Sequence, residues 1–143
     1  MVDDGFMPMG DTLHVRVEGD LVVVRTFGLM TVGDIHALLG VYQQLHAAYV
    51  HYFALYDCSR GLGLDPAARR ALISSSFTLL VPRATVIYGA SFAVRTLGNM
   101  IERALVGLGR VSVGMRFAET EAQARAYLDQ ERIRIKKEPR ISL

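Results

Sequence analysis

Short apolar segments, separated by turn-forming residues and amphipathic stretches, predict four strand–helix units between residues 21 and 130. Before them, residues 13–17 alternate between apolar and polar side chains, which predicts a strand buried on one face. Residues 18–20 (Glu-Gly-Asp) predict a turn, and residues 21–24 are apolar on both faces. We therefore expect a hairpin whose second strand lies nearer the middle of the sheet.

Three further segments are predicted to be strands, and their patterns place them within the sheet. Residues 52–56 and 85–88 are apolar on both faces, which is typical of a strand covered on both sides. Residues 111–117 alternate instead, which predicts a strand with one wet face. The two alternating segments, 13–17 and 111–117, are therefore expected at the edges of the sheet.

Residues that favour helix N-termini precede each predicted helix. Thr31, Ser91 and Thr120 each offer a side-chain oxygen that can accept a hydrogen bond from an amide of the first helical turn. Asp65 offers the same and is followed by Pro66, a residue favoured at the first helical position. Apolar residues at helical spacing follow these capping positions, so each helix is expected to pack one face on the sheet.

Together these elements predict a single-domain α/β fold. The expected sheet is mixed and five-stranded, with one antiparallel edge strand and then four parallel strands in sequential order, joined by right-handed crossover helices. The chain divides into an N-terminal segment (1–11), the domain (12–130) and a basic C-terminal tail (131–143). Residues 132–136 alternate between basic and apolar side chains, which permits an extended conformation on the domain.

Positive charge is concentrated near the C-terminal end. Five of the 16 Lys and Arg residues and two of the 14 acidic residues follow Gln130, which leaves residues 1–130 with 11 basic and 12 acidic residues. A nucleic-acid-binding domain instead carries its basic residues across a folded face. The charge pattern therefore argues against a nucleic-acid partner.

The composition also indicates the environment of the protein. Hydrophobic residues make up 51% of the 143 residues, enough for a substantial core, and the single cysteine, Cys58, excludes an internal disulfide. No apolar segment reaches the roughly 20 residues of a membrane-spanning helix. The acidic start of the chain is unlike a signal peptide. We expect a cytoplasmic protein without a membrane span.

No combination of residues predicts a catalytic or metal site. Ser91 lies between a predicted strand and helix, as in the nucleophile elbow of hydrolases, but all four histidines precede it, whereas that fold places its histidine later. Gly61 and Gly63 begin a dinucleotide-binding motif whose third glycine is missing. His36 and His46 would point about 80° apart around a helix. We expect no enzymatic activity, no cofactor and no metal.

Two short segments and the order of the elements point to a known family. The first segment is the strand end Leu55-Tyr56-Asp57-Cys58-Ser59, and the second is Phe117-Ala118-Glu119-Thr120-Glu121 followed by Ala124, Ala126, Tyr127 and Leu128. Over about residues 12–130 the chain resembles the STAS family of SpoIIAA-like anti-sigma-factor antagonists. The resemblance implies the fold described above and a regulatory function.

The resemblance also concerns a phosphorylation switch. In that family, a hydroxyl in an Asp-Ser-Ser or Asp-Thr-Ser segment, at the start of the helix after the third strand, is phosphorylated by a partner kinase. This chain has Asp65-Pro66-Ala67 there, so we expect no switch at that position. The nearest hydroxyls on the same predicted helix are those of Ser74, Ser75 and Ser76.

The first functional hypothesis is a non-catalytic regulatory module that binds a protein partner. The expected contact surface comprises the predicted loop 58–64 and the helix that begins at Pro66. The residues assigned to this surface are Asp57, Cys58, Ser59, Arg60, Asp65, Arg69 and Arg70.

The alternative is a carrier or sensor of a small apolar ligand, because some relatives resemble lipid-binding proteins of the Sec14 type. A deep apolar pocket would favour this hypothesis, and a flat or convex surface at the loop would favour the interaction module. The residues predicted to line the pocket are Tyr52, Phe53, Tyr56, Tyr88 and Met115.

Self-association is a further expectation. Sequential right-handed crossovers would place most helices on one face of the sheet, and the other face would need a cover. A second copy of the chain or the apolar residues 6–9 would provide it, so a homodimer is predicted.

Overall fold

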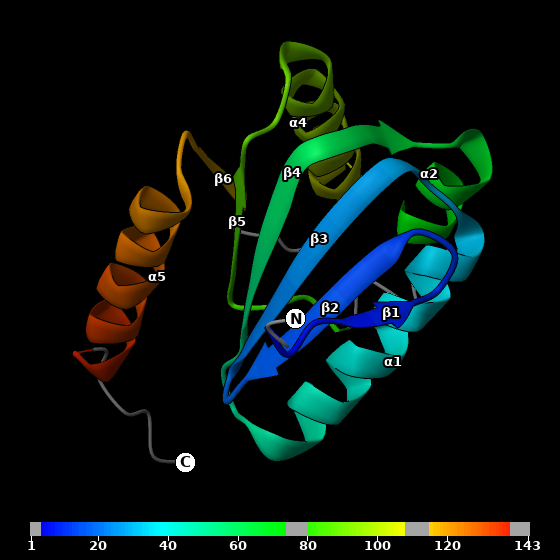
Figure 1. Cartoon of the computed structure of the whole chain (residues 1–143). Helices are drawn as coiled ribbons and strands as arrows, with labels where there is room; N and C mark the ends of the chain where they lie inside the picture. The colour runs from blue at the N-terminus through cyan, green and yellow to red at the C-terminus, as the bar shows by residue number, and fades with distance from the viewer. Residues whose placement is uncertain (1–3, 74–79, 108–114, 138–143) are drawn as a thin grey trace.

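The computed structural model describes residues 4–73, 80–107 and 115–137, which form one mixed β-sheet flanked by helices (Figure 1). The strands are β1 (Met7–Met9), β2 (Leu13–Glu18), β3 (Leu21–Met30), β4 (Phe53–Leu64), β5 (Ala84–Tyr88) and β6 (Met115–Ala118). The helices are α1 (Val32–Ala48), α2 (Pro66–Ile73), α4 (Phe92–Gly107) and α5 (Glu121–Lys136).

The six strands lie in the order of the sequence, β1-β2-β3-β4-β5-β6. The β1–β2 and β2–β3 pairs are antiparallel, and every pair from β3 to β6 is parallel. This arrangement confirms the predicted mixed α/β sheet with sequential parallel strands. The predicted strand at 111–117 is described only from Met115 onward, and its earlier residues lie outside the described part of the chain.

One edge of the sheet differs from the prediction. β1 pairs with the outer side of β2, so the sheet has six strands rather than five, and β2 is not the edge strand. The sequence Met-Pro-Met carries neither alternation nor β-branched residues, which is why it gave no strand signal. Proline is tolerated there because an edge strand has one row of amides outside the ladder.

The second difference concerns β4, which continues to Leu64 where the sequence predicted a loop over residues 58–64. The extension pairs with the end of β3, from Phe27–Arg60 to Met30–Leu64, with two register shifts. Gly61 interrupts the apolar pattern, yet the strand requires a glycine there. A Cβ at Gly61 would lie 2.3 Å from Oγ1 of Thr26 on the neighbouring strand.

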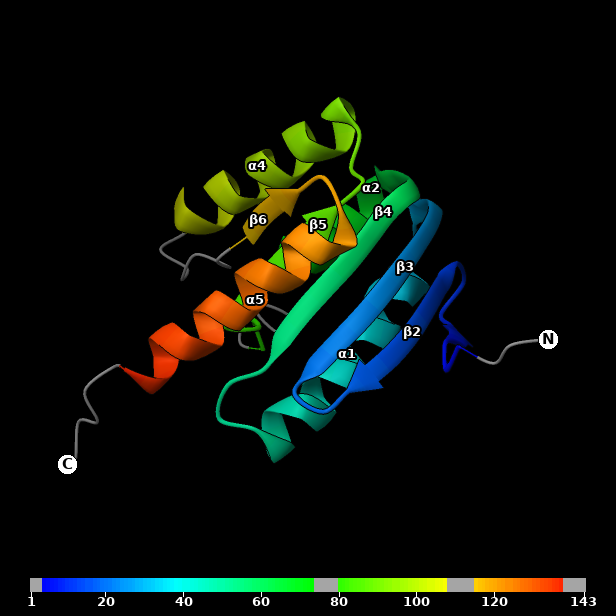
Figure 2. The same ribbon diagram turned by 60° about the vertical axis from the view of Figure 1, so that its left-hand side comes forward.

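Helices cover both faces of the sheet, but unequally. Figure 2 shows α5 in front of the sheet and α1 behind it. Residues of α1, α2 and α4 line a common cavity on the α1 side, as described below. This distribution agrees with the expectation that most helices share one face.

Side chains of alternate strand residues build a separate core on each face. On the α1 side, Val22, Val24 and Ala54 pack with Ile35 and Leu38. On the α5 side the core consists of Leu21, Val23, Phe53, Leu55, Val86, Ala118, Ala124 and Leu128. The strands are therefore apolar on both faces because both faces are covered.

The N-terminal segment also covers part of the α5 side. The Phe6 ring lies beneath the guanidinium groups of Arg16 and Arg25, with Cζ atoms 4.5 and 3.7 Å from the ring centroid. Much of the face that was expected to need a second copy is thus covered within one chain. The homodimer stays a prediction.

The start of the predicted basic tail is helical. Arg132, Ile133, Arg134, Ile135 and Lys136 belong to α5, so the extended conformation that their alternation permits is not the one they adopt. The helix continues because Ile135 packs against the α5-side core and Arg132 binds Asp20 through two hydrogen bonds of 2.7 and 3.3 Å. Among the described residues, no helix is both long and apolar enough to cross a membrane.

Candidate functional site

The residues assigned to a protein partner lie where β3 and β4 end and α2 begins. The backbone amide of Asp65 donates to the carbonyl of Met30 at 3.0 Å, which joins the two strand ends. The Asp65 carboxylate accepts the amide of Ala68 at 2.7 Å and so caps α2, as predicted. This carboxylate oxygen is therefore occupied by a hydrogen bond within the domain.

Asp57 and Ser59 are hydrogen bonded to each other in the middle of β4. One carboxylate oxygen of Asp57 accepts both the amide of Ser59 at 3.0 Å and its hydroxyl at 2.6 Å. Such bonds shape the backbone at the point where the β3–β4 register shifts. Both side chains thus help to position the strand end.

Cys58 lies inside the molecule, with 9% of its surface exposed. Burial raises the pKa of its thiol to about 11, so the thiol is protonated and unreactive at neutral pH. Its side chain lines the interior cavity rather than the outer surface. Cys58 therefore belongs with the candidate ligand site.

Three basic residues and one apolar residue are exposed at this end of the sheet. Arg60, Arg69 and Arg70 are all exposed, and the Arg69 Nε donates to the carbonyl of Leu64 at 3.2 Å. Leu62, which is not among the residues predicted to bind a partner, is 71% exposed. We call these four residues, Arg60, Leu62, Arg69 and Arg70, the docking surface. Leu62 could have been selected only if the strand extension had been predicted.

An apolar cavity of about 130 Å³ lies on the other side of the β4 extension, beneath α1, α2 and α4. Tyr56 and Met115 line it, as predicted. Its other described lining residues are Thr26, Met30, Ile35, Leu38, Tyr42, Cys58, Gly61, Gly63, Leu64, Leu72, Val81, Pro82, Thr85, Ile87, Val94, Leu97, Gly98 and Ile101.

The structure places the other three predicted pocket residues elsewhere. Phe53 and Tyr88 pack on the α5 side of the sheet, where the Tyr88 hydroxyl donates to Glu121 at 3.2 Å. Tyr52 lies on the α1 side, but its hydroxyl donates to the carbonyl of Leu80 and it does not line the cavity. The sequence could not show on which face of the sheet each of these side chains lies, because the strands are apolar on both faces.

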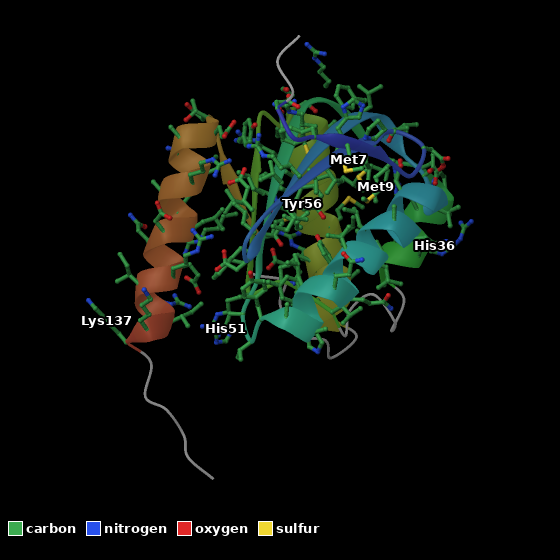
Figure 3. All side chains as sticks on the ribbon, turned by 60° about the horizontal axis from the view of Figure 1, so that its bottom comes forward. Met7, Met9, His36, His51, Tyr56 and Lys137 are labelled. Carbon is green, nitrogen blue, oxygen red and sulfur yellow. The ribbon has the colours of Figure 1, made fainter. Side chains whose placement is uncertain are left out.

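Two buried phenols meet at the cavity wall. The hydroxyls of Tyr42 and Tyr56 are hydrogen bonded to each other, and Figure 3 shows Tyr56 within the interior of the domain. Burial raises the pKa of both side chains, so both are neutral at physiological pH. The described lining residues include no Asp, Glu, Lys, Arg or His, so the wall carries no formal charge.

Candidate catalytic and metal-binding residues are not brought together in the described part of the chain. No group of three or more His, Cys, Asp and Glu side chains among those residues is arranged to hold a metal ion. His36 and His51 lie far apart in Figure 3. Ser91 caps α4 by accepting the amide of Val94 at 3.3 Å, which confirms its predicted structural role.

Comparison with known proteins identifies the fold. No family model and no curated protein sequence matches the chain. The anti-sigma factor antagonist SpoIIAA in its unphosphorylated form is similar, with a TM-score of 0.53 and 12% identity over 85% of this chain and 98% of that chain. A protein of the DUF3478 family from Shewanella loihica, described as having a SpoIIAA-like fold, has a TM-score of 0.54 and 16% identity over 90% of this chain and 98% of that chain. The chain therefore has the SpoIIAA-like fold that its sequence resembled.

Proposed function

We propose that the protein is a non-catalytic regulatory module that binds a protein partner through the docking surface. The observation that carries the proposal is the exposure of Leu62, 71%, at the strand end that also presents Arg60, with Arg69 and Arg70 on the following helix. The similarity of the fold to the anti-sigma factor antagonist SpoIIAA supports a regulatory role.

The chemistry of the docking surface favours an acidic partner with an apolar contact. Burying Leu62 against a partner would remove apolar surface from water, which favours association. The three arginines can form bidentate hydrogen bonds with carboxylates. The β3–β4 pairing fixes the backbone at Arg60 and at Gly61 and Gly63 on either side of Leu62, so little conformational entropy is lost when a partner binds.

Binding through this surface would be constitutive. Asp65 is used as the N-cap of α2, Pro66 is the first residue of that helix, and Ala68 is fully buried. None of these residues has a hydroxyl that a kinase could phosphorylate. Ser74, Ser75 and Ser76 lie outside the described residues, and stoichiometric phosphate on any of them in phosphopeptide mapping would contradict constitutive binding.

A paired charge reversal tests the docking surface. Proteins captured from the native host by the wild-type chain would be identified by mass spectrometry, and the affinity of a purified partner measured by calorimetry. Arg69→Glu with Arg70→Glu should weaken that affinity by about tenfold or more, because the reversed charges repel an acidic surface.

Arg103→Glu, an exposed substitution on α4, is the matched control and should leave the affinity unchanged. Circular dichroism would establish that all variants fold. Equal affinity of the wild-type chain and the double variant for every purified partner would refute the docking surface.

A further inference from the structure

The cavity beneath the β4 extension is an apolar space that the proposed docking function does not use. Its walls come from strands β3 to β6 and from helices α1, α2 and α4. Protein interiors are normally packed with few voids larger than a water molecule. A space of about 130 Å³ is therefore unusual and suggests a bound molecule.

The walls of the cavity are held in place by close packing behind them. Gly98 of α4 lies against β6, where a Cβ would come within 2.9 Å of Cζ of Phe117 and 3.1 Å of Sδ of Met115. Gly61 lies even closer to its neighbour, since a Cβ there would come within 2.3 Å of Oγ1 of Thr26 on β3. Both glycines leave the backbone no room to shift toward these neighbours, so this part of the cavity wall is fixed in position.

The lining chemistry determines what the cavity can hold. The polar groups among its described side chains are the hydroxyls of Thr26, Thr85, Tyr42 and Tyr56 and the thiol of Cys58, and the two phenols are already hydrogen bonded to each other. A charged ligand group would lose its hydration without gaining a charged partner. A bound molecule should therefore be uncharged and mainly apolar.

The volume limits the size of that molecule. An apolar cavity of about 150 Å³ in another protein stays dry and binds benzene. Pockets for drug-sized ligands are larger, at about 300 to 1,000 Å³. A cavity of about 130 Å³ thus suits one aromatic ring or a short aliphatic chain, and it is too small for a long-chain lipid.

We propose that this cavity is a binding site for a small, uncharged apolar molecule of about the size of a single substituted ring. The site is separate from the docking surface, because Gly61 and Gly63 line the cavity whereas Leu62 between them is exposed. It does not depend on the docking proposal, and either proposal can fail alone.

Methyl NMR of the wild-type protein with toluene as the probe tests the site directly. Toluene should shift the methyl resonances of Leu38, Leu97 and Ile101 in a saturable way, and the methyls of Leu128 on the α5 side should move little. Decanoate, which carries a charge and a long chain, should bind about tenfold more weakly or not at all. Absence of saturable shifts with toluene, or tighter binding of decanoate, would overturn the proposal.

A matched pair of substitutions on α4 locates the site. Val94→Phe adds a ring at a half-buried lining position and should weaken toluene binding by about tenfold. Val106→Phe makes the same change where the side chain is 55% exposed and should bind toluene like the wild type. Equal binding by the two folded variants would place the toluene elsewhere and refute this cavity as the site. If Val94→Phe does not fold, the wild-type NMR experiment still decides the proposal.

Discussion

The side chain of Asp34 joins the turn between β1 and β2 to the start of helix α1. It is fully buried and accepts the amides of Asp11 and Thr12 at 2.7 and 2.9 Å and the Thr12 hydroxyl at 2.6 Å. With Thr31 it also completes a capping box at the start of α1. Burial opposes ionisation of Asp34, but these hydrogen bonds outweigh it and lower the pKa of the carboxyl group.

Asp34→Ala should lower the free energy of unfolding by about 1 to 3 kcal/mol, because buried amides lose their acceptor. Urea titrations at several pH values would measure the loss. The folded-state pKa lies below the ordinary value of 3.8, so the ionised side chain stabilises the protein above that pH, and the stabilisation disappears as the pH falls through the lowered pKa.

The difference in stability between the wild type and Asp34→Ala should therefore be full at neutral pH and shrink below about pH 4. Asp129→Ala is the control, since its side chain is 69% exposed and its loss should cost little. A difference that stays constant down to pH 2 would contradict the ionised, hydrogen-bonded state of Asp34.

At the scale of elements, the residues that begin helices were the easiest to predict. Thr31, Asp65, Ser91 and Thr120 each accept an amide of the first turn, because capping depends on chemistry within four residues. The face on which a strand side chain lies was harder, because β4 is apolar on both sides. Phe53 and Tyr56 therefore belong to different cores, although the sequence suggested one pocket.

Long-range contacts account for what the sequence could not show. β1 has no pattern of its own and forms through pairing with β2. Helix α5 is joined to the β2–β3 hairpin by ion pairs between Arg125 and Glu18 and between Arg132 and Asp20, residues far apart in the sequence. Periodicity reports local preference and cannot reveal such partners.

Helix α5 should contribute strongly to stability, because its inner residues belong to the core on that side of the sheet. Leu128 is 1% exposed in the α5-side core, so Leu128→Ala should lower the free energy of unfolding by about 2 to 5 kcal/mol. Ile133→Ala, at a position 55% exposed on the same helix, should cost less than about 0.5 kcal/mol. Similar losses for both variants in a denaturant titration would show that the inner face of α5 is misassigned.

At the scale of the whole molecule, the two proposed sites share the end of β4. Its alternate residues face the apolar cavity on one side, through Gly61 and Gly63, and present Leu62 on the other. α5 lies across the opposite face of the sheet from α1 and contributes to neither site (Figure 2). The fold thus separates an interior suited to a small apolar molecule from a basic outer surface suited to a protein.

Hydrogen–deuterium exchange of the protein, alone and saturated with its purified partner, tests the proposed docking most directly. The proposal predicts that partner binding slows exchange in residues 60–64 and 66–70, where the docking surface lies, and leaves α5 unchanged. Protection confined to β1 or α5, with exchange in residues 60–70 unaltered, would contradict the assignment of this surface as the site of partner binding.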